Sequence, residues 1–192
     1  MPSIVLRDYQ LQLLADLRAA LKAHRRVCAV MPTGAGKGQT IGAIARGAAG
    51  KGRRVLVLAH RDELVQQARD KLQAALGSQA EVAVEQADSM ASAAAKVVVA
   101  SIRSLHARRL ERLLAERDFG LVIYDECHHA VADDNQRILR RLGCFDTDWT
   151  GTLLGFTATV ERADGLGLDR VFERIVFYRT LPDLIGAGHA PL

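Results

Sequence analysis

The sequence predicts an α/β domain, a three-layer sandwich with a mostly parallel central β-sheet between two layers of helices. Short apolar runs recur along the 192 residues, and stretches with helical spacing of apolar residues separate them. The runs expected to form strands buried on both faces are 27–31, 55–59, 97–101, 121–124 and 154–156. Polar residues follow these runs, and ligands of such sheets bind beyond the carboxyl ends of the strands. We therefore expect one domain with one shared site at that edge.

The N-terminal half contains three predicted helices. Residues 4–10 lead into the first, for which Asp8 is the expected cap and leucines recur at helical spacing. A Gly- and Ala-rich helix is expected over 37–49, and Gly-Lys-Gly at 50–52 ends it. The apolar face of a third helix consists of Leu64, Val65, Ala68, Leu72, Ala75 and Leu76.

The C-terminal half continues the alternation of strands and helices. Further expected elements are a short strand at 82–84, a basic helix at 104–117, a polar helix at 134–142 and an irregular loop at 143–151. Residues 87–95, rich in Ala and Ser, fit either a short helix or a loose connection. The tail at 171–187 carries both strand-like and helical patterns, so its structure stays open at this point.

Composition favours a globular protein of a reducing compartment. The net charge of +4 and the isoelectric point near 9.2 tolerate an anionic partner without requiring one. Cys28, Cys127 and Cys144 form no C-x-x-C pair, which argues against a disulfide framework. No signal peptide opens the chain, and no apolar run approaches the ~20 residues of a membrane span. We therefore predict a cytoplasmic protein that does not contact a membrane.

Residues 27–40 have the clearest chemistry of the chain. An apolar strand enters a Gly-rich turn at 33–36, Lys37 follows, and a helix of small residues begins. Glycine lets the backbone turn so that successive N–H groups point at one anion, and the helix start adds partial positive charge. This pattern is typical of a phosphate-binding loop. The expected nucleotide-binding residues are Pro32, Thr33, Gly34, Ala35, Gly36, Lys37, Gly38 and Gln39.

Two residues depart from the general phosphate-loop pattern G-x-x-x-x-G-K-[ST]. Met31 replaces the first glycine, which is a mild change because Gly34 and Gly36 still supply the turn. Gly38 replaces the Ser or Thr whose hydroxyl ligates Mg²⁺. Thr40 is a poor substitute, since it lies about 200° further round a helix. Loss of such a contact typically costs ~3 kcal/mol, or about a hundredfold in rate, so we expect nucleotide binding with slow hydrolysis.

Asp125 and Glu126 close an apolar strand and precede Cys127, His128 and His129. Neighbouring strand residues point to opposite faces, so a turn is needed to bring both carboxylates to one site. There Asp125 can hold Mg²⁺ beside the phosphate loop, and Glu126 can orient and polarise the attacking water. Consecutive residues ligate one zinc ion poorly, and no second ligand pair has suitable spacing. We therefore assign His128 to a polar relay from the nucleotide.

Six short motifs occur along the chain in a fixed order. They are Leu-Arg-Asp-Tyr-Gln (6–10), Met-Pro-Thr-Gly-Ala-Gly-Lys (31–37), Ala-His-Arg-Asp-Glu-Leu (59–64), Val-Ala-Ser-Ile-Arg-Ser-Leu (99–105), Asp-Glu-Cys-His (125–128) and Gly-Phe-Thr-Ala-Thr (155–159). With them the chain resembles the first RecA-like lobe of superfamily 2 helicases of the DEAD/DEAH-box group. It is most similar to the branch of type III restriction enzyme helicase subunits and excision-repair helicases. The resemblance implies a RecA-like P-loop NTPase fold, with a helicase ATP-binding domain over 1–188 and the start of a linker at 189–192.

The resemblance also implies residue roles in ATP binding and hydrolysis with Mg²⁺. Arg7 and Gln10 would recognise adenine. Lys37, Asp125 and Glu126 would be catalytic, with Asp125 holding Mg²⁺ and Glu126 acting as base toward water. Coupling of nucleotide state to nucleic acid would involve His128, Thr157 and Thr159. The phosphates of a bound strand, DNA in preference to RNA, would lie near His60, Arg61, Ser101 and Arg103.

The family's second lobe, absent from this sequence, carries arginine fingers that are worth about 10³–10⁵ in rate. The resemblance therefore implies that the chain alone binds ATP, hydrolyses it poorly and does not unwind nucleic acid. Two other functions stay open. One is a nucleotide-sensing module that has lost hydrolysis because of Gly38. The other is a small-molecule kinase, which would leave the Thr-Ala-Thr strand end unexplained.

Overall fold

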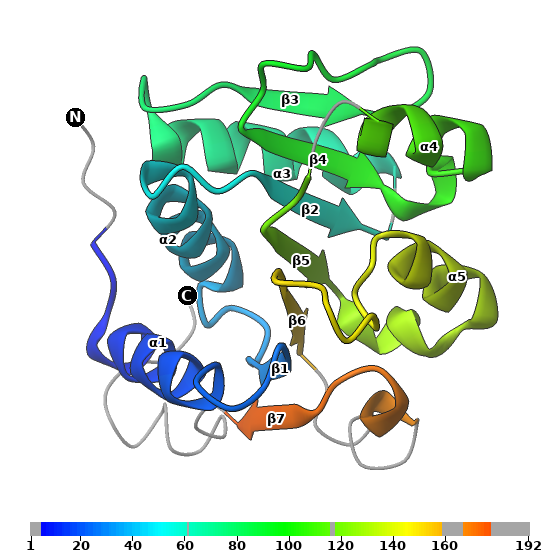
Figure 1. Cartoon of the computed structure of the whole chain (residues 1–192). Coiled ribbons are helices and arrows are strands. Elements are labelled where there is room, and N and C mark those ends of the chain that lie inside the picture. The colour runs from blue at the N-terminus through cyan, green and yellow to red at the C-terminus, as the bar shows by residue number, and fades with distance from the viewer. Residues whose placement is uncertain (1–4, 61, 116–117, 159–166, 178–192) are drawn as a thin grey trace.

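A parallel β-sheet forms the centre of the molecule (Figure 1). The computed structural model describes residues 5–60, 62–115, 118–158 and 167–177, to which all structural statements here refer. Within this part of the chain the strand order is β3-β4-β2-β5-β6-β1-β7, and every pair is parallel. The strands are β1 (Arg26–Val30), β2 (Val55–Ala59), β3 (Val82–Glu85), β4 (Val97–Ser101), β5 (Leu121–Asp125), β6 (Thr152–Thr157) and β7 (Arg174–Phe177). The predicted α/β class with a largely parallel sheet is confirmed.

Helices cover both faces of the sheet (Figure 1). On one face lie α1 (Asp8–Ala20), α2 (Lys37–Gly50) and α3 (Asp62–Leu76). On the other lie α4 (Ala107–Ala115), α5 (Asp133–Arg141) and the 3₁₀ turns η1 (Ile102–Ser104), η2 (Cys127–Val131) and η3 (Leu168–Arg170). Along β1, Val27 and Ala29 join the first core while Cys28 and Val30 join the second, because strand side chains alternate between faces. The three-layer sandwich follows from this alternation.

The strand order brings three strand ends to one edge of the sheet. Strand β6 lies between β1 and β5, pairing Thr157 with Val30 on one side and Phe156 with Asp125 on the other. The loop after β1 and the carboxylates at the end of β5 therefore flank the end of β6. Because all three strands are parallel, these ends share the carboxyl edge at which such sheets bind ligands.

The start of two helices differs from the sequence prediction. Asp8 is the first residue of α1 and does not cap it; Arg7 precedes the helix, and its backbone N–H donates to Gln10 Oε1 at 2.9 Å. The basic helix begins at Ala107 because the turn η1 first occupies Ile102–Ser104. In both places the local hydrogen bonding of the preceding turn sets the helix start.

Residues 87–95 contain no helix. Glu85, fully buried at the end of β3, accepts a hydrogen bond from Ala91 N at 2.9 Å. Its carboxylate also forms ion pairs with Arg109 at 3.0 Å and Arg112 at 2.7 Å, both on α4. A buried carboxylate needs such partners because its desolvation is costly. The segment is therefore a loop that one buried anion ties to α4, the second of the two structures that the sequence allowed.

Two other expectations concern Leu64 and the tail. Leu64 was expected on the buried face of α3 but is 36% exposed, while the adjacent Val65 is fully buried. Neighbouring helical residues point about 100° apart, so only one of them faces the core here.

The tail supplies β7 at the edge of the sheet, and positions 178–187 lie outside the described residues. No helix of the described part is long and apolar enough to cross a bilayer.

Gly155 in β6 should not tolerate a side chain. An added Cβ would lie 2.4 Å from Phe172 Cζ and 2.7 Å from Cys127 Sγ, and both of these residues are buried. We expect Gly155→Ala to lower the free energy of unfolding by about 1–3 kcal/mol, as overpacking does in cores. Gly47→Ala, on the exposed side of α2 with nothing within 4 Å of the new Cβ, is the matched control. It should raise stability by up to ~1 kcal/mol. Urea unfolding measures both, and an unchanged Gly155→Ala midpoint would contradict the packing.

Candidate active site

The phosphate-binding loop connects β1 to α2 and has the expected left-handed turns. Gly34 has φ +82° and Gly36 has φ +76°, values that L side chains rarely adopt. A Cβ on Gly36 would also come within 2.5 Å of Gln10 Nε2, so the position has no room for a side chain. Helix α2 begins immediately afterwards at Lys37. Its free N–H groups and the positive end of its dipole lie beside the loop, as an anion site requires.

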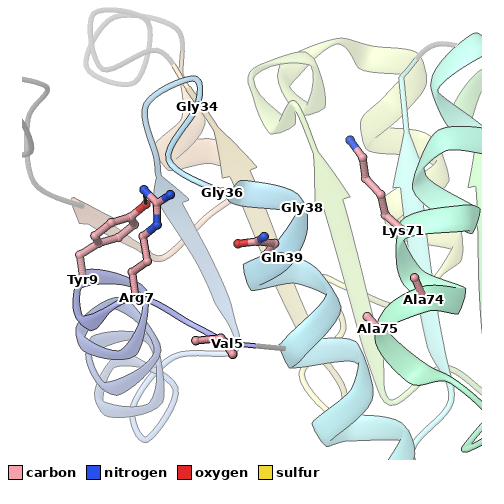
Figure 2. A pocket seen from close by; sticks show the side chains of 10 residues that line it. All are labelled: Val5, Arg7, Tyr9, Gly34, Gly36, Gly38, Gln39, Lys71, Ala74 and Ala75. Atoms are coloured by element: carbon pink, nitrogen blue, oxygen red, sulfur yellow. Dashed lines mark hydrogen bonds between the residues drawn. The ribbon is translucent and has the colours of Figure 1, made fainter. Parts of the chain in front are cut away.

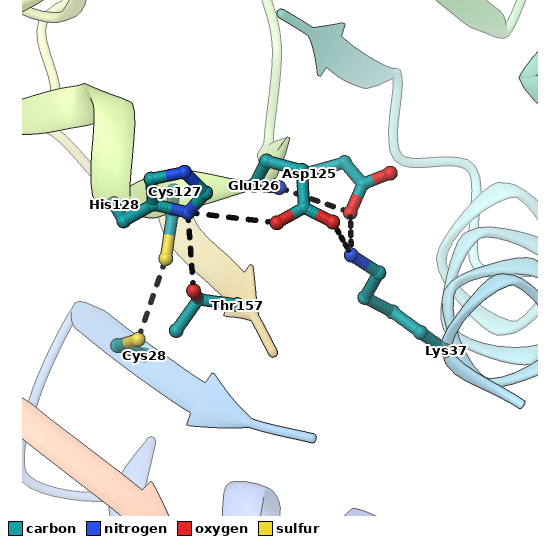
Figure 3. A network of polar contacts seen from close by, with 7 residues as sticks. All are labelled: Cys28, Lys37, Asp125, Glu126, Cys127, His128 and Thr157. Carbon is teal, nitrogen blue, oxygen red and sulfur yellow. Dashed lines mark hydrogen bonds and ion pairs between the residues drawn. The ribbon is translucent and has the colours of Figure 1, made fainter. Parts of the chain in front are cut away.

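Lys37 joins the loop to the two carboxylates at the end of β5 (Figure 3). Its Nζ lies 2.8 Å from Asp125 Oδ1 and also contacts Glu126 Oε1. Burial lowers the pKa of Lys37, but the charges and hydrogen bonds of the two carboxylates outweigh it and raise the pKa above its ordinary value. The prediction that the loop lysine and the strand-end carboxylates meet at one edge is confirmed.

The backbone at Glu126 explains how two successive carboxylates reach one ammonium. Glu126 has φ +54° and ψ +49°, a left-handed conformation that is uncommon for a residue other than glycine. This turn ends the strand alternation that would otherwise point Asp125 and Glu126 to opposite faces. The Glu126 N–H donates to Asp125 Oδ1 at 3.0 Å and holds the first carboxylate in place. Strained backbone of this kind is frequent at functional sites.

His128 links the carboxylates to the end of β6. Its Nδ1 lies 3.2 Å from Thr157 Oγ1 and 3.5 Å from Glu126 Oε2 (Figure 3). Thr157 is fully buried, so the hydrogen bond is shielded from water. His128 and Thr157 are therefore in contact, and their role in a polar relay stays a prediction. Thr159, the third residue predicted for this relay, lies outside the described residues.

Cys127 lies under this network and contacts Cys28, with 3.4 Å between the two sulfur atoms. Burial, together with the neighbouring Cys28 thiol, raises the pKa of Cys127 well above its ordinary value. The thiol therefore stays neutral, and the thiolate form that a metal or an electrophile requires is disfavoured. Its place is in the core, against the space that Gly155 leaves open.

Gln10 is fully buried, and its amide braces the phosphate loop. Its Nε2 donates to Gly36 O and to Thr40 Oγ1, both at 3.1 Å, while its Oε1 accepts from Arg7 N. Thr40 Oγ1 in turn lies 3.3 Å from Gly36 O. The Thr40 hydroxyl is thus committed inside the molecule, in agreement with the expectation that it does not replace the hydroxyl missing at Gly38. Recognition of adenine by Arg7 and Gln10 stays a prediction.

A cavity of about 650 Å³ opens beside the loop (Figure 2). Its walls come from the segment leading into α1, from the loop and the start of α2, and from α3. The lining residues are Val5, Arg7, Tyr9, Gly34, Gly36, Gly38, Gln39, Lys71, Ala74 and Ala75. Arg7 lies over the Tyr9 ring, with 5.9 Å from its guanidinium carbon to the ring centroid. Sequence reasoning missed Tyr9, although it stands between Arg7 and Gln10. It also missed the α3 residues, for which no local pattern exists.

The positions expected to contact nucleic acid lie at or just after the ends of β2 and β4, which are neighbours in the sheet. Arg103 is exposed, whereas Ser101 is fully buried and its hydroxyl has no hydrogen-bond partner among the described residues. His60 is half-buried and stacks on His129, with ring centroids 3.5 Å apart. His129, considered from the sequence only as a zinc ligand and given no role, thereby joins the end of β2 to η2. Arg61 lies outside the described residues.

The residues at this edge fit a magnesium ion whose ligands come mainly from substrate phosphates and water. Asp125 supplies a carboxylate oxygen, the ligand type that Mg²⁺ prefers. Gly38 has no side-chain oxygen, and the Thr40 hydroxyl faces Gln10. Magnesium commonly keeps several waters and uses one or two carboxylates plus substrate phosphates. Asp125 could supply the single carboxylate that such an arrangement needs.

The sequence pattern of the family described as type III restriction enzyme, res subunit, matches residues 3–162. A Schizosaccharomyces pombe protein named as a mitochondrial ATP-dependent helicase, irc3, is 33% identical over 189 residues, which are 95% of this chain and 30% of the relative. A Saccharomyces cerevisiae protein named as an ATP-dependent helicase, IRC3, is 36% identical over 89 residues, 46% of this chain and 13% of the relative. The chain thus spans less than a third of the length of these curated relatives.

Solved helicase structures share the fold. The UvsW helicase from bacteriophage T4 superposes with a TM-score of 0.67 at 19% identity, covering 90% of this chain and 60% of that one. The helicase domain of Pyrococcus furiosus Hef gives 0.63 at 25% identity, covering 90% and 39%. The type ISP restriction-modification enzyme LlaGI, solved with a DNA substrate mimic, gives 0.68 at 16% identity, covering 96% and 21%.

Replacing Lys37 by methionine should remove a pH-dependent contribution to stability. The folded pKa of Lys37 lies above its ordinary value of 10.5. Such a group stabilises the fold fully below its unfolded pKa and loses this contribution as the pH rises through the folded pKa. We expect Lys37→Met to lower the free energy of unfolding by about 1–3 kcal/mol at neutral pH. The difference from wild type should stay constant up to about pH 10 and shrink above it.

Urea unfolding between neutral pH and about pH 11.5 tests this dependence, because that pH range spans the titration of lysine. The exposed Lys22, which follows α1, provides the control variant Lys22→Met. It removes the same charge without touching the carboxylates, so its stability should track wild type at every pH. A Lys37→Met difference that persists undiminished at the alkaline end would contradict the ion pairs as their origin.

Proposed function

Because this chain belongs to the type III restriction enzyme res subunit family and is the first RecA-like lobe of a superfamily 2 helicase, we propose that it binds ATP with Mg²⁺ for nucleic-acid-dependent hydrolysis. The observation that carries the proposal is the contact of Lys37 with Asp125 and Glu126 beside a loop built to receive an anion. A lysine, two carboxylates and a helix start at one edge match the needs of phosphoryl transfer, which are positioning and charge stabilisation.

Each group of the cluster has a role in this proposal. The backbone of Gly34 and Gly36 and the start of α2 would bind the phosphates, and Lys37 would leave its carboxylates to bind the terminal ones. Asp125 would then be free to hold Mg²⁺, which, when bound, neutralises phosphate charge. Glu126 would accept the proton of the attacking water, as a carboxylate base does. The His128 ring, within reach of both Glu126 and Thr157, would pass the state of the site to β6.

We propose that the adenosine part of the nucleotide occupies the cavity of about 650 Å³ beside the loop, on the side of Arg7 and Tyr9. Arg7 would contact the base from one wall, and the Tyr9 ring next to it offers an aromatic face. In our proposal Gln10 fixes the loop from behind and also takes part in recognising the adenine edge. An amide offers the donor and acceptor pair that an adenine edge needs.

Nucleic acid would bind at the neighbouring strand ends, near His60, Arg61, Ser101 and Arg103. We propose DNA in preference to RNA; the neighbour LlaGI was solved with a DNA substrate mimic. Contacts to phosphates would position the strand without reading its sequence. Thr157 and Thr159 would couple this surface to the nucleotide.

Translocation and unwinding belong to the whole protein in this proposal. The chain spans 30% of the length of the S. pombe relative, which leaves ample sequence for a second lobe. We assign residues 1–188 to the ATP-binding domain and 189–192 to the linker that leads to that lobe. A cytoplasmic location is our proposal, while the S. pombe relative is named as mitochondrial.

A second candidate function, a nucleotide sensor without hydrolysis, is favoured by Gly38. No hydroxyl stands at that position, and the hydroxyl two positions further along, on Thr40, is held by Gln10 and Gly36. The sensor would bind nucleotide with the same loop and respond through the same relay. The two functions differ in whether Glu126 has a role in turnover.

Glu126→Gln should separate the candidates. If Glu126 is the base, this change lowers kcat for ATP in the full-length protein by at least about a hundredfold, while ATP affinity stays within about threefold. Phosphate release with and without single-stranded DNA measures turnover, and fluorescent-nucleotide titration measures binding. Asp134→Asn, which neutralises an exposed carboxylate on α5, should leave both unchanged. Equal phosphate release by wild type and Glu126→Gln would exclude the base assignment and favour the sensor.

Gly38→Thr should accelerate hydrolysis. A Cβ at this position meets only Lys71 Cδ at 3.5 Å, an ordinary contact, so α2 has room for the side chain. Restoring the Mg²⁺-binding hydroxyl should raise kcat by up to about a hundredfold, the value of one transition-state contact. Gly47→Thr, on the exposed side of the same helix, is the control for a general effect on α2. A Gly38→Thr protein that is no faster would argue against our account of the missing ligand.

A further inference from the structure

The α3 wall of the cavity contributes a cation that the site described above does not use. Lys71 lines the cavity together with Gly34, Gly36 and Gly38. Figure 2 shows its side chain rising from α3, beside the start of α2, toward the same end of the sheet as the phosphate loop. No sequence motif marks Lys71, because α3 reaches the loop only through its packing beside α2.

Gly38 and Lys71 are neighbours in space. A Cβ built on Gly38 would lie 3.5 Å from Lys71 Cδ and within 4 Å of no other group outside its own helical surroundings. The lysine stem therefore passes over the bare backbone of the one loop position that lacks the usual hydroxyl. A four-carbon stem of this kind can lie along a surface and carry its ammonium further, to a polar partner.

The net charge of the neighbouring cluster favours a further cation at this position. Lys37 already faces two carboxylates, so the cluster of Lys37, Asp125 and Glu126 carries one net negative charge. A polyphosphate would meet that charge without the hydroxyl that usually helps to hold Mg²⁺. Lys71 is exposed and makes no ion pair with any described residue. Its charge is available at the wall of the same cavity.

We infer that Lys71 binds the phosphates of a nucleoside triphosphate, and that Gly38 leaves open the space through which it reaches them. The inference rests on the proposed ATP-binding function. Lys71 adds positive charge beside the phosphates at a site where the protein lacks the hydroxyl that usually helps to hold Mg²⁺. As a point charge on a flexible stem, it serves binding of the β- and γ-phosphates more than fine positioning.

Affinities of the full-length protein for MgATP, MgADP and adenosine test the inference. Lys71→Met should weaken MgATP binding about fivefold to tenfold and MgADP binding less, as expected for loss of one charge-assisted contact. Adenosine binding should stay within about twofold, because it carries no phosphate. Lys71→Arg should retain most of the MgATP affinity, and the MgATP effect should shrink between about 50 and 300 mM NaCl because salt screens the charge.

Arg69→Met is the matched control. Arg69 stands on the same helix, carries the same charge and pairs with Asp70, but it does not line the cavity. Its loss should leave all three affinities unchanged. Equal MgATP affinities of wild type and Lys71→Met would overturn the inference alone. A wild-type protein that does not bind MgATP would overturn the proposed function, and the inference with it.

The role of Gly38 has its own measurement. In a Gly38→Thr background the new side chain contacts the Lys71 stem and supplies the missing hydroxyl. Lys71→Met should then weaken MgATP binding by less than about twofold, so the two changes should be strongly non-additive. A loss as large as in wild type would overturn the role that we assign to Gly38.

Discussion

The ion pairs of Lys37 with Asp125 and Glu126 hold together two segments that the sheet keeps a whole strand apart. Strand β6 lies between β1 and β5, so a long side chain at the start of α2 has to bridge the two outer strand ends. The left-handed backbone of Glu126 turns the second carboxylate toward the same ammonium. The cluster of Lys37, Asp125 and Glu126 has a net negative charge, which would repel a polyphosphate. When a polyphosphate binds, it must therefore replace the two carboxylates as the partner of Lys37. The proposed chemistry starts from that exchange.

The buried layers on either side of this cluster are arranged to keep it in place. On one side, the Gln10 amide joins the start of α1 to the phosphate loop and to Thr40, so the loop is shaped before any ligand arrives. On the other, Gly155 leaves the space that the Cys127 thiol fills beneath η2. The turn that carries His128 therefore rests on an apolar support, and the ring is held within reach of Glu126 and Thr157.

The absence of a hydroxyl at Gly38 connects the two candidate functions. If that loss is uncompensated, the loop still binds phosphate through its backbone but holds its metal weakly, which favours a sensor. If charge from α3 compensates for it, a helix outside the usual phosphate loop becomes part of the site. The position of Lys71 beside the bare backbone makes the second arrangement physically reasonable. Family membership supports a helicase lobe in either case.

The fold class, the phosphate loop and the contact of Lys37 with Asp125 could all be predicted from the sequence. Each depends on a pattern within one element or on the common edge that parallel strands must share. Three features could be seen only in the folded molecule: the Gln10 amide is buried against the loop, His129 stacks on His60, and Lys71 lines the cavity. These contacts join elements far apart in the chain. They depend on how helices and turns pack across the sheet, and no local spacing of residues encodes that geometry.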